Sequence, residues 1–468
     1  MKSPCQQSRR SFLGQASCAA VTATPILSTL LNLRMTNSAI AASNDPNDYK
    51  ALVCFFFGGG NDSHNMLAPK GNAEYAEYAT TRSNQALAQA SILALNGTHN
   101  GKTYGVHPGM PEIQSLYNSN RLAFVCNVGT LVENVTLAGY ESGASKLPAG
   151  LFSHSDQIMH WQTSVPDAPS STGWGGRVAD LLSSCNSNSQ ISMNISLAGT
   201  NTFQSGNQTV SYEIEPSGNG SISLMPYAEG ENPTMAALGQ TAINSMMDAQ
   251  YSNLFQQAFA DRNRNALDAS AAFSSAIAAQ SLTTAFTANR ISQSFEMIAK
   301  TIKARDVLGM KRQTFFVMFG GFDHHDELLN NHAAMLPVIS TAMSEFDAAM
   351  TEINMNDKVT TFTASDFART LTSNGKGTDH GWGSNQMVMG GAVNGGQFYG
   401  SYPSLALGSP LDTGRGRLIP TMSTDEYFAE LARWFGVSNA DLTQVFPNLT
   451  RFYTPSTTSP VGFMSSTA

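Results

Sequence analysis

Positive charge is scarce in this sequence. Lysine and arginine together number 26 in 468 residues, against 34 aspartates and glutamates, and all charged residues make up only 13%. The chain contains no basic stripe and no block of like charges, so it lacks the usual sequence signature of a nucleic-acid-binding surface. The acidic balance favours solubility and disfavours polyanionic partners.

Common catalytic and cofactor motifs are missing as well. There is no phosphate-binding P-loop, no Gly-x-Ser-x-Gly nucleophile elbow and no His-Glu-x-x-His zinc helix. The glycines at 58–60 do not continue into a dinucleotide-binding fingerprint, and no repeat of 20–50 residues is present. Any catalytic site must therefore be assembled from residues that lie far apart in the sequence.

Cysteine is too sparse for a disulfide framework. Two of the five cysteines lie in the first 42 residues, and no Cys-x-x-Cys motif occurs. Cys54 and Cys126 lie in strongly apolar runs and are predicted to be buried thiols, whereas Cys185 lies in a loop rich in serine and asparagine. Three remaining cysteines allow one bridge at most.

The N-terminus has the pattern of a twin-arginine export signal. Residues 8–13 (SRRSFL) precede a weakly apolar stretch at 16–33 and a small-residue cleavage site at 39–41 (AIA). The alternative is a chance arginine pair before a core helix. We predict that residues 1–42 are a signal peptide and that the mature protein is periplasmic or secreted. The apolar stretch is too interrupted for a stable membrane anchor, which needs about 20 apolar residues.

Signal removal makes the chain more acidic. Residues 1–42 contain four of the 26 basic residues and none of the 34 acidic ones, so the formal net charge changes from −8 to −12. This charge does not exclude a small anionic substrate, because a bound metal ion dominates its local field.

Alternating apolar runs and helical patterns predict an α/β protein. Short, nearly continuous apolar runs are typical of strands that are buried on both faces. We predict strands at 51–57, 122–128, 191–197, 314–319 and 358–363, and helices at 111–118, 176–184, 326–355 and 424–435. The alternation favours a largely parallel central sheet between helical layers, in one large domain with insertions or in two domains.

The middle of the chain has a different character. Residues 199–239 are rich in Asn, Ser, Gly and Pro and are predicted to be irregular or β-rich. Residues 246–308 contain no glycine or proline and predict one long helix or two shorter ones. We interpret residues 199–308 as an insertion whose helices mainly pack, with a lid or partner-binding role as the alternative.

Polar side chains directly follow three of the predicted strands. Asp62 follows the first strand through a glycine turn. Asp323 and His325 follow the strand at 314–319, and Asp366 follows the strand at 358–363. The carboxyl ends of parallel strands meet at one edge of a sheet, where ligands bind. Carboxylates and imidazoles gathered there could hold a divalent cation that assists hydrolysis, although each aspartate could instead cap a helix.

Further candidates accompany these ligands. A glycine-framed loop at 377–383 holds Asp379 and His380, which are a common ligand or acid–base pair. Ser153, at the start of a predicted helix, is a candidate nucleophile or simply a helix cap. Arg369 could hold a substrate anion through two guanidinium nitrogens. The residues predicted to contact the ligands or the substrate are Asn61, His107, His154 and His324.

These clusters, in this order, resemble the bacterial family called "domain of unknown function 1501", whose proteins typically carry twin-arginine signals. The matching motifs are GGND at 59–62, HPGM at 107–110, FSHSDQ at 152–157, GFDHH at 321–325, SDFART at 365–370 and GTDHGWG at 377–383. That family is similar to the alkaline phosphatase and arylsulfatase superfamily. The resemblance implies a three-layer α/β/α domain over residues 43–468 with a metal site at the strand ends.

The resemblance also implies roles for individual residues. Asp62 corresponds to the first aspartate of the superfamily, Asp323 and His325 to an Asp/His ligand pair, and His380 to the final histidine ligand. Asp366 corresponds to the aspartate of an Asp-His unit, unless Asp379 and His380 themselves form that unit. The sequence departs from the phosphatases at Phe367, where they have a ligating histidine, and it lacks the Cys/Ser-x-Pro-x-Arg context of the arylsulfatases.

Two functions follow from these expectations. The first is an exported hydrolase of phosphate or sulfate esters, with one or two divalent ions (zinc, manganese or calcium) and a small anionic ester or a sulfated or phosphorylated glycan as substrate. The second is a non-catalytic exported protein that uses the same fold for binding or surface assembly. Metal bound stoichiometrically by the candidate ligands would distinguish the first from the second.

Overall fold

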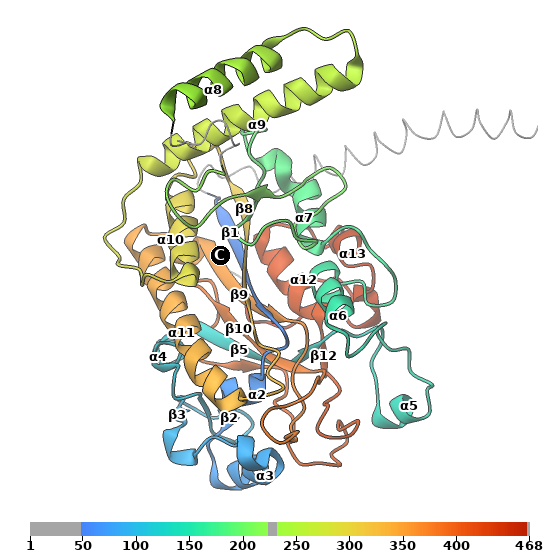
Figure 1. Ribbon diagram of the computed structural model, residues 1–468. Helices are drawn as coiled ribbons and strands as arrows, with labels where there is room; N and C mark the ends of the chain where they lie inside the picture. The colour runs from blue at the N-terminus through green and yellow to red at the C-terminus, as the bar shows by residue number, and fades with distance from the viewer. Residues whose placement is uncertain (1–47, 223–231, 466–468) are drawn as a thin grey trace, which may run out of the picture.

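A central sheet lies between two layers of helices in the computed structural model (Figure 1), which describes residues 48–222 and 232–465. The predicted signal peptide lies outside these residues. The strands are β1 (Lys50–Gly58), β5 (Leu122–Gly129), β6 (Asn194–Ser196), β7 (Tyr212–Glu213), β8 (Arg312–Gly320), β9 (Val359–Ser365), β10 (Ser384–Met389), β11 (Phe398–Tyr399) and β12 (Met422–Ser423). The predicted α/β fold with a largely parallel sheet is confirmed.

The sheet has the order β11-β5-β10-β9-β1-β8-β6-β7, and β12 also pairs with β5. Every described pairing in it is parallel except the two that β10 makes with β5 and β9. The sequence analysis did not predict β10, because its six residues begin with a polar Ser-Asn-Gln run. The strand predicted at 191–197 is shorter than expected and covers only Asn194–Ser196.

Alternate residues of β1 supply the two cores. Val53, Phe55 and Phe57 pack in one hydrophobic cluster, and Leu52, Cys54 and Phe56 pack in the other. The first cluster is covered by α4 (Pro111–Asn118), α10 (Arg290–Lys303) and α11 (Leu328–Glu352). The second is covered by α6 (His154–Thr163), α7 (Trp174–Leu182), α12 (Thr424–Phe435) and α13 (Leu442–Val445). A strand that is apolar on both faces is thus explained by burial on both sides.

The remaining elements extend from this core. A small antiparallel sheet contains β2 (Leu67–Pro69), β3 (Leu93–Ala94) and β4 (Tyr104–Val106), in the order β2-β4-β3. The short helices α2 (Ser63–Met66), α3 (Asn72–Arg82) and α5 (Leu137–Glu141) lie in connections. Among the described residues, no helix combines the length and the apolarity that crossing a bilayer requires. Cys54, Cys126 and Cys185 are all buried.

The helical segment at 246–308 divides into two helices, which was one of the two expectations. Asn253 and Asn289 each accept backbone N–H groups through the side chain, and they cap α9 (Leu254–Ala278) and α10. A third helix, α8 (Pro233–Asp248), begins inside the segment predicted to be irregular, with Asn232 as its cap and a proline at its first position. Asparagine capping therefore divides a region that lacks glycine and proline.

A buried acid in α12 makes stability depend on pH. Asp425 is fully buried, and burial raises its pKa from 3.8 to about 8, against a partial opposing effect of the Arg177 charge. Because the folded-state pKa lies above the unfolded value, Asp425 costs stability increasingly as the pH rises from 4 to 8.

Asp425→Asn has no such proton to lose. We expect the free energy of unfolding of Asp425→Asn, relative to that of the wild type, to increase by up to about 5 kcal/mol between pH 4 and pH 8. Urea unfolding at several pH values measures this difference. A stability difference that stays constant across that range would contradict the assignment.

Candidate functional site

The candidate site lies where β9, β1 and β8 end side by side. These three strands are neighbours and parallel, so the loops after Gly58, Gly320 and Ser365 share one edge of the sheet. The antiparallel strand β10 starts at the same edge, which places the preceding 377–383 loop there as well. The sheet topology therefore brings the polar clusters that follow these strands to the same edge, as the sequence predicted.

A glycine permits the close approach of two of these loops. Gly59 has φ of 114°, and a Cβ there would lie 2.6 Å from the Asp323 backbone nitrogen. Its own N–H lies 3.1 and 3.2 Å from the two carboxylate oxygens of Asp366. The Gly59 turn thus connects the ends of β1, β8 and β9.

Three side-chain atoms converge at the centre of the site. His325 Nε2 lies 3.0 Å from Asp323 Oδ1, His380 Nε2 lies 3.3 Å from the same oxygen, and the two nitrogens are 3.1 Å apart. Each Nε2 atom carries at most one hydrogen, so the two rings supply at most two hydrogens for three contacts. The convergence therefore favours a cation among these atoms.

His154 approaches the same carboxylate from the helical layer. It is the first residue of α6, and its Nε2 lies 3.4 Å from Asp323 Oδ2. That nitrogen is buried and has no hydrogen-bond partner among the described residues. Ligand atoms of His154, Asp323 and His380 all lie within 4.8 Å of one another. An orphaned ring nitrogen that is aimed at a shared carboxylate is a fitting ligand for a metal ion.

The opposite nitrogen of each ring has an oxygen partner. His154 Nδ1 lies 2.7 Å from Asp366 Oδ2, and His380 Nδ1 lies 2.7 Å from the backbone oxygen of Phe152. His325 Nδ1 lies 3.1 Å from Asp379 Oδ1. In the tautomer that carries its hydrogen on Nδ1, each ring donates to its oxygen partner and turns its Nε2 lone pair toward Asp323. This is how metal-binding histidines are commonly oriented.

The distances fit a divalent ion coordinated by nitrogen and oxygen. Zinc–ligand bonds of 2.0–2.2 Å in tetrahedral geometry separate the ligand atoms by roughly 3.3 Å. The contacts to Asp323 from the three rings span 3.0 to 3.4 Å. Three imidazoles and one carboxylate suit zinc or manganese better than calcium, which prefers oxygen ligands.

Arg369 holds the central carboxylate in place. Its side chain is fully buried, and its Nη1 donates to Asp323 Oδ1 at 2.7 Å. Its other donors bind the Gly59 backbone oxygen and both oxygens of Thr378. Burial would raise the pKa of Asp323, but the hydrogen bond and charge of Arg369 outweigh it and lower that pKa. These contacts occupy the guanidinium that the sequence analysis predicted for a substrate anion.

Asp379 is held by charged and polar neighbours. Its Oδ2 lies 2.6 Å from Nη1 of Arg415, and Asn374 donates to its Oδ1 at 3.3 Å. Burial would raise the pKa of Asp379, but the hydrogen bonds of Asn374 and Arg415 lower it. Like Asp366, this carboxylate contacts a histidine of the cluster rather than Asp323.

The histidines on either side of Asp323 have opposite pKa shifts. The hydrogen bond with Asp366 raises the pKa of His154, whereas burial lowers the pKa of His380. His380 is therefore neutral at neutral pH, with its Nε2 lone pair available for a cation.

Ser153 and Phe367 also lie beside this cluster. Ser153 occupies the cap position of α6, but its hydroxyl contacts Ser155 Oγ at 3.1 Å and makes no capping bond. The Phe367 ring packs 4.8 Å from the His154 ring and 4.6 Å from the His380 ring, measured between centroids. Phe367 thus forms an apolar wall beside two rings of the cluster.

Asp62 lies in a buried ion pair and does not contact the cluster. Arg82 donates to its Oδ2, and the Asn65 N–H lies 3.2 Å from its Oδ1. Burial would raise the pKa of Asp62, but attraction by Arg82 outweighs it and lowers that pKa. The neighbouring Asn61 is also buried, and its N–H donates to Ser365 Oγ.

His107 and His324 pack with a third histidine in the interior. The His332 ring centroid lies 5.3 Å from that of His324 and 6.2 Å from that of His107. Burial lowers the pKa of all three, to about 4 for His107 and about 3 for His332. These rings are neutral packing neighbours behind the strand ends.

Several important partners carried no recognisable sequence signal. Arg82 and Arg415 lie in unrelated segments, and only the fold brings them to Asp62 and Asp379. His154 belongs to the 152–157 motif, for which the sequence predicts a contact with the ligands or the substrate but not a ligand role. The position of His154 in the first turn of a predicted helix is the signal that could have identified it as a ligand.

A family model described as "Protein of unknown function (DUF1501)" matches residues 49–441, which is most of the chain. The chain belongs to the DUF1501 family. This match confirms the family resemblance. A comparison with curated proteins gives no match.

Solved structures give weak similarities to this DUF1501 protein. One is "Ps i-CgsB", with 10% identity, a TM-score of 0.35, and coverage of 87% of this chain and 77% of that one. Another is the "PsFucS1 sulfatase from Pseudoalteromonas sp.", with 10% identity, a TM-score of 0.33, and coverage of 87% and 72%. The lipoteichoic acid synthase LtaP from Listeria monocytogenes has 7% identity, a TM-score of 0.27, and coverage of 71% and 62%. Similarity this low indicates neither a shared substrate nor a shared mechanism.

Proposed function

We propose that this protein is an exported, metal-dependent hydrolase of phosphate or sulfate esters. The observation that carries the proposal is the convergence of the Nε2 atoms of His154, His325 and His380 on the Asp323 carboxylate, with every Nδ1 atom next to an oxygen. These four residues would hold the ion. When bound, a divalent ion supplies an activated water and stabilises negative charge.

The accessibility of the site supports catalysis rather than a purely structural role. A catalytic metal site must admit water or substrate to the ion, and a zinc ion with four ligands can take a fifth in the transition state. The side chains of Asp323 and His325 are 44% and 45% exposed. A substrate can therefore reach the ligand cluster from solvent.

Two arginines supply positive charge beside the cluster in an otherwise acidic protein. Arg415 is 44% exposed and pairs with Asp379, and Arg417 donates to the His380 backbone oxygen while packing on the Phe152 ring. Positive groups beside a metal site attract anionic esters and repel cationic ones. In this proposal, Arg369 orients Asp323, and Arg415 and Arg417 attract the substrate anion.

The carboxylates behind the rings give a prediction about metal affinity. Asp366→Asn or Asp379→Asn should weaken metal binding by 10- to 100-fold, because the amide no longer fixes the tautomer of the histidine in front of it. Competition with a fluorescent chelator measures the affinity. Asp326→Asn, at an exposed position that pairs with Lys376, is the control and should leave the affinity unchanged. Equal affinities in all three variants would contradict these roles.

The function is tested by turnover with simple esters. The metal-loaded mature protein is assayed with p-nitrophenyl phosphate and p-nitrophenyl sulfate, with p-nitrophenyl acetate as the neutral control. We expect chelator-sensitive turnover of one of the anionic esters that returns when the metal is restored. A metal-loaded protein that turns over neither anionic ester would contradict the hydrolase and favour the exported binding protein.

A further inference from the structure

The helical hairpin of α8 and α9 extends away from the body of the molecule (Figure 1). None of the 16 residues of α8 is buried, and Ala260 is the only buried residue in the first half of α9. The buried residues of the second half, which include Phe273 and Ile277, belong to the main core. Helices depend chiefly on the packing of an apolar face, so this end of the hairpin lacks the burial that normally stabilises a helix.

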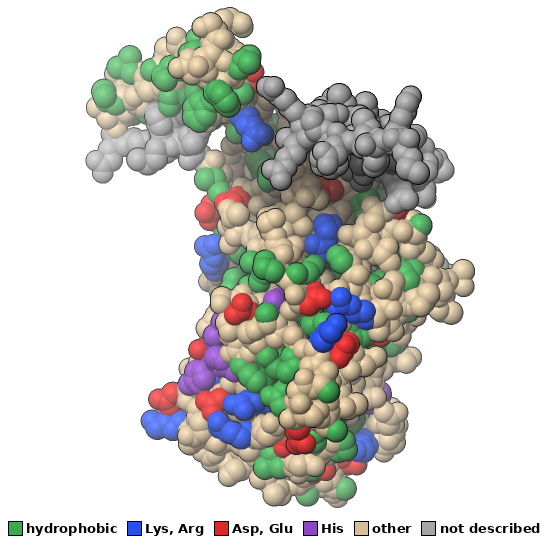
Figure 2. Space-filling view, turned by 90° about the vertical axis from the view of Figure 1, so that its right-hand side faces the viewer, with side chains coloured by type: hydrophobic (Ala, Val, Ile, Leu, Met, Phe, Trp, Pro, Cys, Tyr) green, Lys and Arg blue, Asp and Glu red, His purple; other side chains and the backbone are tan. Residues whose placement is uncertain are grey.

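The hairpin exposes apolar side chains at helical spacing. On α8 they are Met235, Leu238 and Met246, which follow one another at intervals of three and eight residues. On α9, Leu254 and Phe255 are 84% and 88% exposed. Hydrophobic side chains gather over this hairpin at the top of the molecule in Figure 2. Large apolar side chains grouped in this way mark an interaction surface.

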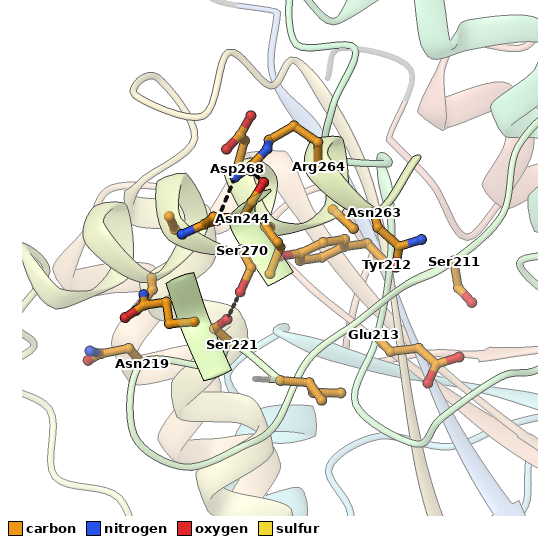
Figure 3. Close-up of a pocket in the computed structure, with 16 residues that line it drawn as sticks. Ser211, Tyr212, Glu213, Asn219, Ser221, Asn244, Asn263, Arg264, Asp268 and Ser270 are labelled. Carbon is orange, nitrogen blue, oxygen red and sulfur yellow. Dashed lines mark hydrogen bonds between the residues drawn. The ribbon is translucent and has the colours of Figure 1, made fainter. Parts of the chain in front are cut away.

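The inner side of the hairpin carries both polar and apolar side chains. A cavity of about 1150 Å³ lies between α9, α8 and the segment around β7. The side chains of Asn244, Arg264 and Ser270 line it, and Arg264 donates to Asn244 (Figure 3). Leu254 and Phe255 do not line this cavity. The large exposed apolar side chains at this end of the hairpin therefore lie outside the cavity.

The charge of the hairpin restricts its partner. Between Pro233 and Phe259 the only charged residue is Asp248, which pairs with Arg264. Anionic lipid surfaces and nucleic acids recruit helices that are rich in lysine and arginine, and this segment has neither. A neutral apolar face can pack against an identical face without repulsion, even though the whole protein is acidic.

We propose that the α8–α9 hairpin is a homodimer interface, in which the hairpins of two copies pack face to face as four helices. A two-fold axis lets the same apolar patch serve both copies. The helix α8, about 24 Å long, and an equal length of α9 beside it present a face of roughly 500 Å², at the upper end of the apolar patches that monomers expose. Such packing would remove Leu254, Phe255 and Phe259, which are 84%, 88% and 66% exposed, from water.

The oligomeric state of the mature protein tests this proposal. Light scattering after size-exclusion chromatography at micromolar concentration should give twice the monomer mass. Phe255→Glu combined with Phe259→Glu should raise the dissociation constant at least about 100-fold and give monomers with unchanged circular dichroism. Val307→Glu replaces an apolar residue that is 76% exposed outside the hairpin, and this control should remain dimeric.

A monomeric wild type would overturn the proposal. So would dimers that persist in the folded double variant, because the interface would then lie elsewhere. Binding of the monomeric wild type to vesicles of phosphatidylglycerol would assign the patch to lipid instead. None of these readouts depends on the metal centre.

Discussion

If the proposed metal site is correct, replacing His380 by alanine should abolish binding of the divalent ion and reduce the proposed ester hydrolysis by at least about 1000-fold. The variant lacks one of the two nitrogens that converge on Asp323 Oδ1, and it also loses the ring that contacts the Phe152 oxygen. Three ligands of a four-ligand set bind a metal far more weakly. Elemental analysis and the rate with the preferred p-nitrophenyl ester measure both effects on the same sample.

A histidine outside the cluster provides the control for this variant. His99 lies near the surface and stacks on Phe398, with a ring-centroid distance of 5.2 Å. His99→Ala should retain the metal and the rate. Retention of both by His380→Ala would show that this residue is no ligand, and loss of both by His99→Ala would point to general instability.

Asp62→Asn is expected to lower the free energy of unfolding by about 3–5 kcal/mol without removing the metal. Asp62 and Arg82 are both fully buried, so the substitution leaves the Arg82 guanidinium without its counter-charge. The charge pair also makes stability depend on pH. Because the folded pKa of Asp62 is lowered, its contribution is present above the unfolded value and lost as the pH falls through the folded one.

An exposed ion pair is the matched control for Asp62→Asn. Asp248 is 68% exposed and pairs with Arg264, so Asp248→Asn should cost less than about 1 kcal/mol. Urea unfolding and metal content together separate the two roles that the sequence allowed for Asp62. Loss of metal in a stable Asp62→Asn protein would restore Asp62 as a ligand and contradict the ion-pair account.

The sequence predicted the sheet because its strands are buried on both faces. Runs such as 51–57 can be recognised without knowledge of their neighbours, since an unbroken apolar run of this length suits a parallel strand. The antiparallel β10 could not be recognised in this way. The residues of β10 join the sheet because they pair with β5 and β9, whose strands cannot be identified as its partners from the sequence.

The site could be predicted by region but not by role. Strand-end positions correctly indicated that Asp323, His325 and Asp366 would lie together. A carboxylate can point at a histidine ring or at the centre of the ligand cluster. The sequence does not distinguish these cases, because they depend on the orientation of the side chain. Asp366 was predicted to be a ligand, but its carboxylate contacts the Nδ1 atom of His154. Asp62 was also predicted to be a ligand, but it forms an ion pair with Arg82 of α3.

The central claim is that Asp323 and the three histidines around it bind a divalent ion. The most direct test is elemental mass spectrometry of the purified, exported protein, before and after incubation with zinc, manganese or calcium. The account predicts about one tightly bound zinc or manganese ion per chain. A folded wild-type protein that holds no divalent ion after all three incubations would contradict it.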